Sequence, residues 1–266
     1  YRYKGTGIMN QNERREYLIK YLLKEEIRFG RQSIPADKQG QENLLRSLMN
    51  VRPPRPISHE FLEIQDEYLT ERNIERGITD VATLTPVKSD SRLYIWQGDI
   101  TTLKCDAIVN ACNSQMLGCF SPMHACIDNF IHTYAGVELR LKMHEIMTKQ
   151  GHEEETGKAK ITSGYNLPAK YVLHTVGPII QWKVTQEDEN LLASCYKECL
   201  KLAADTGVES IAFCCLSTGV FRFPQQRAAE IATETVMQFL KKDDRIKKVI
   251  FNVFKNEDLE IYSHLL

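Results

Sequence analysis

Residues 107–136, AIVNACNSQMLGCFSPMHACIDNFIHTYAG, place a strand-like run before a polar, turn-rich loop and a helix-like segment. The same alternation extends from RLYIWQG at residues 92–98 to the C-terminus. Alternation of this kind predicts a mainly parallel or mixed sheet that is covered by helices on both faces. Ligands of such sheets bind beyond the carboxyl ends of the strands, so we expect the functional residues on the loops there.

The remaining strands and helices follow from short β-branched or aromatic runs and from helical periodicity. The further strand-like runs are KAKITSG, KYVLHTVG, SIAFCCL and KKVIFNVF, and the helix-like segments are roughly 125–149, 188–206, 225–242 and 256–265. Gly207 follows the second of these helices and predicts a left-handed C-cap.

The chain divides near residue 90, and residues 1–90 form a charge-rich helical extension before a second part at 91–266. Helical periodicity occurs in Asn12–Glu26, in residues 41–50 and in the segment HEFLEIQDEYLTERNIER. The run VRPPRP at 51–56 must interrupt any helix, because proline removes a backbone donor and clashes with the preceding turn. We expect this layer to pack on the second part.

Cys119, His124 and Cys126 have the spacing C-x4-H-x-C within the polar loop. Two thiolates and one imidazole can bind Zn²⁺, and three protein ligands leave a coordination position open, as in catalytic zinc sites. A structural zinc finger is disfavoured because no second ligand pair follows at finger spacing. Core packing is the alternative, since cysteine is often buried. Core positions are predicted for six other cysteines: Cys105, Cys112, Cys195, Cys199, Cys214 and Cys215.

Composition excludes several classes of protein. The chain has 34 basic and 35 acidic residues, a net charge of −1, which gives no electrostatic footprint for nucleic-acid binding. No apolar run approaches the roughly 18 residues of a membrane span. The first residues lack the apolar core and cleavage site of a secretory signal. Free thiols without an export signal predict a cytoplasmic protein without a disulfide framework.

Four motifs, in this order, resemble the macrodomain signatures: QGDIT (97–101), AIVNACN (107–113), HTVGP (174–178) and LSTGVFRFP (216–224). The resemblance covers about residues 90–266. It implies a three-layer α/β/α fold with a mixed central sheet that binds ADP-ribose. The C-x4-H-x-C insertion and the helical extension resemble the zinc-containing microbial branch of the family, whose members are mono-ADP-ribosyl-protein hydrolases.

The resemblance also implies which residues bind the substrate. Asp99, beside Ile100, occupies the position that accepts a hydrogen bond from the adenine amino group. A turn-capping aspartate is the alternative for Asp99, and Phe254 is either an adenine-stacking residue or a core residue. The segment Ser217, Thr218, Gly219, Val220 and Phe221 resembles the diphosphate loop, where backbone amides approach phosphate oxygens; Phe221 would pack on the distal ribose.

Catalytic residues are implied on the first loop and the helix after it. Asn113 matches the asparagine that holds the distal ribose, and Asp128 matches the aspartate that positions or activates a water at the anomeric carbon. Where relatives carry a glycine-rich loop, this chain carries its Cys-His-Cys set. Our hypothesis is that zinc, as template and Lewis acid, binds a ribose hydroxyl or a water while Asp128 orients or deprotonates the water.

Alternatives remain open for the activity. The chain could bind ADP-ribose without cleaving it, or hydrolyse O-acetyl-ADP-ribose in the same pocket. A zinc nucleobase deaminase is disfavoured because the required C-x-x-C pair is absent. The resemblance implies an ADP-ribosylated protein as partner, with a modified acidic side chain; a lipoyl-carrier protein modified by a sirtuin-type ADP-ribosyltransferase is one candidate. We expect a monomer. His132 and His174 are predicted to be satisfied core histidines.

Overall fold

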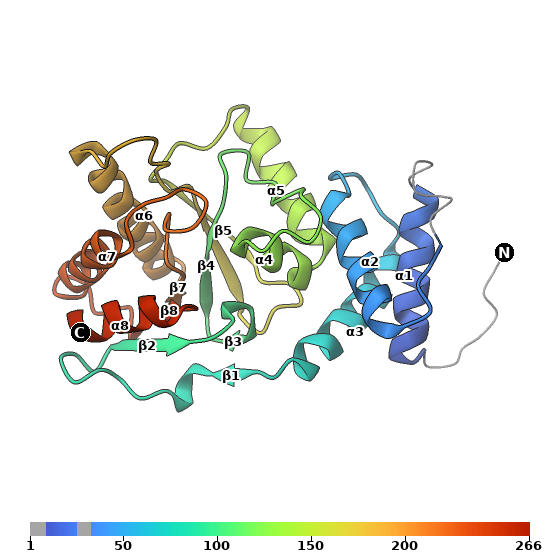
Figure 1. Ribbon diagram of the computed structural model, residues 1–266, viewed down its shortest axis with the longest axis horizontal. Coiled ribbons are helices and arrows are strands. Elements are labelled where there is room, and N and C mark those ends of the chain that lie inside the picture. The colour runs from blue at the N-terminus through green and yellow to red at the C-terminus, as the bar shows by residue number, and fades with distance from the viewer. Residues whose placement is uncertain (1–8, 26–32) are drawn as a thin grey trace.

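The computed structural model describes residues 9–25 and 33–266, and its centre is a six-stranded mixed sheet (Figure 1). The strand order is β2-β8-β7-β4-β6-β5, and only the edge strand β5 is antiparallel to its neighbour. The strands are β2 (Leu93–Gln97), β4 (Ala107–Ala111), β5 (Ala159–Ser163), β6 (Tyr171–Thr175), β7 (Ser210–Phe213) and β8 (Lys248–Val253). Central strands are nearly continuous apolar runs because both faces of the sheet are covered.

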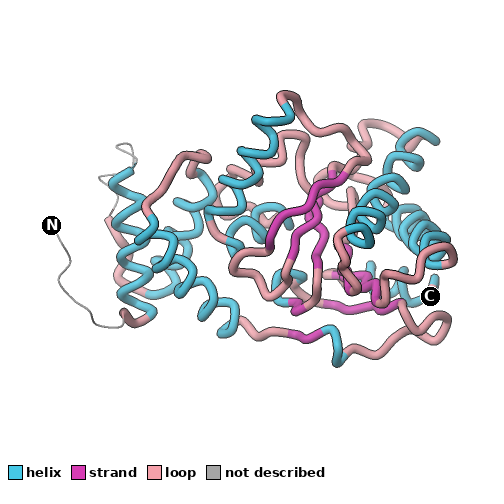
Figure 2. The backbone as a smooth tube through the Cα atoms, turned by 180° about the vertical axis from the view of Figure 1, so that it is seen from behind, coloured by secondary structure: helices cyan, strands magenta, loops and turns pink. Residues whose placement is uncertain are grey.

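Helices cover both faces of this sheet, as Figures 1 and 2 show from opposite sides. One face carries α4 (Ile127–Ala135) and α5 (Val137–Gln150); the other carries α6 (Gln186–Asp205), α7 (Gln225–Leu240) and α8 (Asn256–Leu265). The expected three-layer α/β/α architecture with a mixed sheet is confirmed. Gly207 adopts the predicted left-handed conformation after α6, with φ +78°.

The prediction of one helix over 125–149 is wrong. The chain forms two helices that meet at Gly136, whose φ of +102° ends α4 and starts α5. Residues other than glycine rarely adopt this backbone conformation. A Cβ at this position would also lie 2.7 Å from the Gln65 side chain of the N-terminal helices. The break is therefore set partly by a tertiary contact.

The N-terminal helices form an outer layer beside α4 and α5 (Figure 1). They are α1 (Gln11–Glu25), α2 (Lys38–Val51) and α3 (His59–Glu75), so all three periodic segments are helical; Glu26 lies outside the described residues. Capping begins α2 and α3, where Asp37 accepts from the Gly40 amide and Ser58 from the Phe61 amide. The layer has its own small apolar core, which Val137 of α5 joins.

A second, two-stranded sheet links the outer layer to the main sheet. It pairs β1 (Thr79–Asp80) with β3 (Leu103–Lys104) in parallel, beside the 3₁₀ turns η2 (Val81–Thr83) and η3 (Ile100–Thr102). Strands of two residues carry no periodic signal, so the sequence did not predict them.

The core confirms most of the cysteine assignments. Cys105, Cys112, Cys195, Cys199 and Cys214 are buried, whereas Cys215 is only partly buried; all six are free thiols. Within residues 9–25 and 33–266, no helix combines the length and apolarity that a membrane crossing requires.

Five parallel strands end at the same edge of the main sheet, since β2, β8, β7, β4 and β6 run in one direction. The loops at this edge are 98–99, 112–126, 176–185, 214–224 and 254–255. The antiparallel β5 begins there too, and the Glu154 amide before it donates to the Ser114 carbonyl. All residues with expected functional roles lie on these loops or directly after them.

Candidate active site and metal centre

The fold brings Cys119, His124 and Cys126 together. One donor atom from each lies within 4.8 Å of the others, and Cys119 Sγ is 3.6 Å from His124 Nδ1. Sulfur and nitrogen donors of a tetrahedral zinc are roughly 3.6 Å apart, given the usual bond lengths. The donor set and the Cys119–His124 distance therefore fit a Zn²⁺ ion. His124 is exposed, so the cluster faces solvent on one side.

The loop that carries the cluster has an unusual backbone. Met116, Gly118 and Met123 all have positive φ, at 57°, 83° and 59°. A Cβ on Gly118 would lie 2.8 Å from the His132 ring, so glycine is required there for space as well as conformation. The Asn113 side chain closes the first turn by accepting from the amides of Gln115 and Met116. Part of the role of Asn113 is therefore structural.

Asp128 lies in the first turn of α4, two residues after Cys126, and is only 5% exposed. Its Oδ1 accepts a hydrogen bond of 2.8 Å from Asn110 Nδ2. Burial raises the pKa of Asp128 to about 6, against the opposing effects of the Asn110 hydrogen bond and the Arg140 charge. The carboxylate is thus a stronger base than an exposed aspartate and remains largely ionised at neutral pH.

A chain of buried polar groups extends behind Asp128. Asn110 Nδ2 also lies 3.2 Å from His174 Nδ1, and His174 Nε2 lies 2.9 Å from Thr162 Oγ1. An Asn110 amide that donates to both neighbours requires the His174 tautomer with its hydrogen on Nε2. Burial lowers the pKa of His174 to about 3, so the ring is neutral. His174 is the satisfied core histidine that the sequence predicted.

His132 differs from this prediction. It is buried, as expected, but neither ring nitrogen has a hydrogen-bond partner within the described part of the chain. Its Nε2 lies 3.6 Å from Asp128 Oδ1, one helical turn away. Burial, with smaller effects of Arg140 and His174, holds the pKa of His132 well below its usual range. His132 is therefore a neutral neighbour of Asp128, and the prediction that its hydrogen bonds are satisfied is wrong.

Asp99 lies where β2 ends and is already hydrogen-bonded. Its Oδ1 accepts from both the amide and the hydroxyl of Thr101, so the capping alternative is realised. Its Oδ2 forms an ion pair with Arg76, whose guanidinium stacks 3.4 Å from the centre of the Tyr134 ring. The Asp99 side chain is 35% exposed and can accept a further hydrogen bond. Ile100 next to it is buried in the core.

The loop after β7 is packed tightly at its start and open at its tip. Ser217 is buried with φ +63°, and a Cβ on Gly177 would lie 2.0 Å from its hydroxyl, so glycine is needed for this close approach. The Ile180 amide donates to the Phe221 carbonyl and joins the loop to its neighbour. Among the described residues, the amides of 219–221 donate to no protein acceptor, so they can bind an anion.

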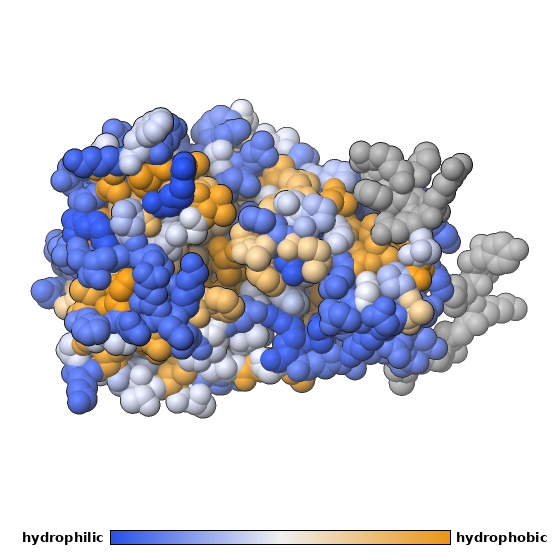
Figure 3. Space-filling view, in the orientation of Figure 1, coloured by the Kyte–Doolittle hydropathy of each residue, from blue (hydrophilic) through white to orange (hydrophobic). Residues whose placement is uncertain are grey.

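The exposure of Phe254 separates the two alternatives that the sequence left for it. Phe254 is 75% exposed, so it is not a core residue and its ring is free to stack on a ligand. The Val220 side chain is 68% exposed at the loop tip, and Thr218 donates its hydroxyl hydrogen to the Cys215 carbonyl. Figure 3 shows an apolar hollow near the centre of the side of the molecule that is seen in Figure 1, between α4 and the α6–α7 side.

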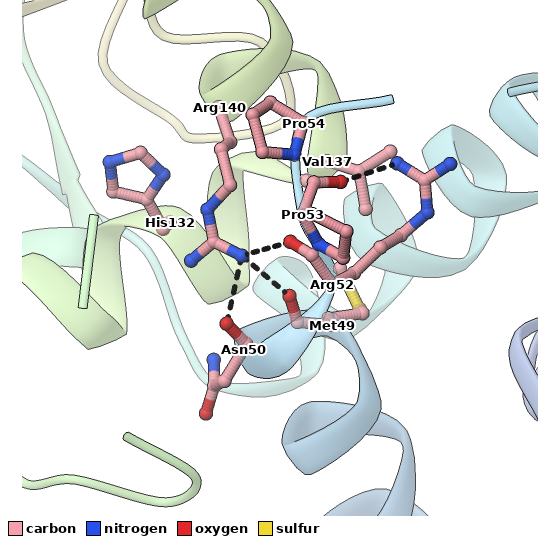
Figure 4. Close-up of a pocket in the computed structure, with 9 residues that line it drawn as sticks. Met49, Asn50, Arg52, Pro53, Pro54, His132, Val137 and Arg140 are labelled. Atoms are coloured by element: carbon pink, nitrogen blue, oxygen red, sulfur yellow. Dashed lines mark hydrogen bonds between the residues drawn. The ribbon is translucent and has the colours of Figure 1, made fainter. Parts of the chain in front are cut away.

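A second hollow lies behind the loop 112–126, which carries the candidate metal ligands and is called the metal loop below; it lies between the outer helices and α4–α5 (Figure 4). Its volume is about 10 Å³, which is room for about one water molecule. It is therefore too small for a nucleotide. Its importance is structural, because the Arg140 guanidinium there donates to three backbone carbonyls at the end of α2.

Sequence reasoning missed four polar residues that contact the site: Arg46, Asn50, Arg76 and Arg140. Three of them belong to the N-terminal helices or to the cap of α3. No local signal could have identified them, because the groups of the site that they contact lie at least 21 residues away in the chain.

The chain is similar to known proteins in both sequence and structure. The macro domain family model matches residues 109–232. A protein-ADP-ribose hydrolase of Treponema medium is 57% identical over 97% of this chain and 100% of the relative. A protein of the same name from Staphylococcus aureus (strain MRSA252) is 50% identical over 96% of both. The Trypanosoma brucei macrodomain in complex with ADP-ribose is similar in structure, with a TM-score of 0.63 and 26% identity, over 98% of this chain and 92% of that one.

Proposed function

The chain belongs to the macro domain family, and we propose that it removes mono-ADP-ribose from modified proteins with the help of a zinc ion held by Cys119, His124 and Cys126. The relatives that match almost its whole length are protein-ADP-ribose hydrolases, and the chain is an enzyme of this class. The zinc requirement and the assignment of individual residues are the finer parts of the proposal.

One structural arrangement supports both the zinc requirement and the catalytic role of Asp128. The Cys-His-Cys cluster ends at Cys126, which caps α4, and buried Asp128 follows in the first turn of the same helix. A ligand set suited to zinc and a carboxylate suited to act as a base are therefore held by one helix end. Zinc held by these residues would supply Lewis acidity to an oxygen ligand.

Residues of the chain itself bind the substrate and transfer the proton. Asp128, oriented by Asn110, accepts a proton from the attacking water at the anomeric carbon. The Asn113 side-chain NH₂ group donates to the distal ribose, while its Oδ1 accepts from the Gln115 amide and holds the loop turn. The amides of 219–221 bind the diphosphate, and Phe221 packs on the distal ribose. Asp99 accepts a hydrogen bond from adenine, on which Phe254 stacks.

The substrate follows from the class of enzyme and from the resemblance. We infer that the hydrolysed bond joins the anomeric carbon to an acidic side chain of the modified protein. A lipoyl-carrier protein modified by a sirtuin-type ADP-ribosyltransferase is the candidate that the family resemblance adds. In this reaction water attacks the anomeric carbon, the carboxylate of the modified side chain leaves, and free ADP-ribose is released.

The test is zinc content together with release of ADP-ribose from a modified protein, for the wild type and Cys126→Ala. We expect the variant to lose both bound zinc and turnover. Cys105→Ala is the matched control, because this buried thiol lies just before β4, at the opposite edge of the sheet from the site. Full turnover by a demonstrably zinc-free enzyme would refute the metal's role.

The sequence left open a non-catalytic ADP-ribose reader, and the protein-ADP-ribose hydrolase relatives argue against it. The buried, hydrogen-bonded Asp128 argues against it, because reading the ligand does not need a buried base. Asn113→Ala that retains ADP-ribose binding but loses turnover would favour the hydrolase. Hydrolysis of O-acetyl-ADP-ribose would use the same pocket, and the ratio of kcat/KM for the two substrates measures which one the enzyme prefers.

A further inference from the structure

The outer helical layer contacts the metal loop directly through Arg46 of α2. The Arg46 guanidinium donates to Asn129 Oδ1 at 2.7 Å and to the carbonyl of His124 at 3.0 Å. It also lies 4.3 Å from the centre of the Phe130 ring. Asn129 in turn donates to the Ser121 carbonyl. Arg46 therefore joins α2 to both the loop and the start of α4.

Asn50, one turn further along α2, makes a second connection. Its Oδ1 accepts from the amide of Met123, and its Nδ2 donates to Thr133 Oγ1 on α4. Met123 has a φ of +59°, a conformation that costs a residue with a side chain about 1 kcal/mol or more. Such a backbone persists only where neighbouring groups hold it, and Asn50 is such a group.

Arg140 of α5 makes the third connection to the loop. Its guanidinium is almost fully buried and donates to the carbonyls of Leu117 and Cys119. The same group donates to the carbonyls of residues 49, 50 and 52, where α2 ends (Figure 4). A helix C-terminus has free carbonyls and partial negative charge, so it stabilises this buried cation.

We propose that the outer helical layer is a positioning element of the active site, in which Arg46 and Asn50, with Arg140, hold the metal loop in its ligand-binding conformation. The proposal rests on the proposed function for the identity of the metal. Its basis is specific: the carbonyls of two candidate ligands, Cys119 and His124, each accept a hydrogen bond from one of these arginines.

Preorganisation explains why such contacts matter. Cys119 and His124 lie on an irregular loop, and ordering that loop only when the metal binds would cost conformational entropy. Groups that orient metal ligands from outside typically change metal affinity by about 10- to 100-fold when removed. A layer that holds the loop before the metal arrives should therefore slow metal loss and keep the ligands in place for turnover.

The first experiment compares zinc release from zinc-loaded wild type, Arg46→Ala and Arg46→Lys after mixing with excess chelator. We expect release to be about 10-fold faster for Arg46→Ala, with partial rescue by Arg46→Lys, which keeps the charge but not the forked geometry. The kcat for ADP-ribose release should fall with little change in KM. Arg72→Ala is the control, because Arg72 pairs with Glu42 and Glu75 inside the same layer.

The second measurement is hydrogen exchange of residues 117–126 in the metal-free protein. We expect faster exchange in Arg46→Ala and in Asn50→Ser, but not in Arg72→Ala. If the wild type binds no zinc, the proposed metal role fails, whereas this exchange experiment still tests the positioning role. Unchanged loop exchange in both variants, with the fold intact, would overturn the inference whatever the metal does.

Discussion

Asp128 combines burial, one strong hydrogen bond and a neutral histidine neighbour at a single helix end. The Asn110 amide holds its carboxylate at 2.8 Å, and His132 adds no charge. Fixing the carboxylate in this way reduces the reorganisation needed when it accepts a proton. This arrangement supports the proposed role of Asp128 as the base that acts on a water.

Replacing Asp128 with asparagine should remove the base and leave the shape of the site intact. We expect kcat to fall by about 10²- to 10⁴-fold, with ADP-ribose affinity within a few-fold of wild type. Single-turnover release of ADP-ribose, with calorimetric titration of ADP-ribose, checks both parts. Wild-type turnover by Asp128→Asn would show that another group is the base.

Gly118 meets two constraints at once, positive φ and contact with the His132 ring. Gly118→Ala should therefore strain the loop backbone and push against a buried ring. We expect a loss of about 1–3 kcal/mol in the free energy of unfolding together with weaker zinc binding. Gly151→Ala, where φ is +80° but the Cβ would meet nothing, isolates the backbone part of this cost. Equal losses for both variants would contradict the steric argument.

Among the elements, α5 contributes a buried arginine, Arg140, whose hydrogen bonds go to backbone carbonyls rather than to a carboxylate. Burial lowers the pKa of Arg140 to about 10, so the group stays charged at neutral pH and relies on backbone carbonyls. A methionine there would leave several of these carbonyls without a donor. Arg140 thus contacts α2 and the metal loop from α5 through one side chain.

Arg140→Met should accordingly lower the free energy of unfolding by about 3 kcal/mol or more. Denaturant titration measures this. Arg227→Met is the surface comparison, because Arg227 is 40% exposed and pairs with Glu189 and Glu230, and its loss should cost about 1 kcal/mol or less. Comparable losses in the two variants would mean that the buried carbonyls find other donors.

For the whole molecule, the outer layer and the α/β/α part share apolar and polar contacts. Val137 of α5 packs into the apolar core of the N-terminal helices, and its amide donates to Gln65. Removing the layer would expose this surface of α4 and α5 and remove Arg46 and Asn50 from the metal loop. The outer layer and α5 are therefore joined by buried surface as well as by a hydrogen bond.

A chain of residues 91–266 alone should show the effect of removing the layer. We expect it to aggregate more readily and to unfold several degrees lower than the full chain, and to lose zinc faster. Scanning calorimetry and light scattering measure the first two effects. A fragment as stable and active as the full chain would show that the layer serves another purpose.

Removing the metal should affect the whole molecule less than the loop. The main sheet and its two helical faces have an extensive buried core that does not include the Cys-His-Cys cluster. We expect chelation to lower the midpoint of thermal unfolding by a few degrees and to abolish turnover. Complete unfolding on chelation would instead identify a structural metal.

Much of the fold could be predicted because its signals are local. Strand-like runs such as AIVNAC and the periodic helices around Leu192 and Leu48 depend on neighbouring residues, and their boundaries agree with the structure to within a few residues. The missed break at Gly136 and the short β1–β3 pair depend on contacts with distant segments. Periodicity contains no information on such contacts.

The sequence by itself determined the α/β/α architecture and the Cys119, His124 and Cys126 group, because periodicity and close spacing act over a few residues. Only the tertiary structure decided what surrounds that group. Arg46 reaches the His124 carbonyl across 78 residues, and Arg76 reaches Asp99 across 23. Hydrogen bonds and ion pairs of this kind depend on how the helices pack against one another. That packing is fixed by the burial of apolar side chains from both layers, and no local sequence pattern specifies it.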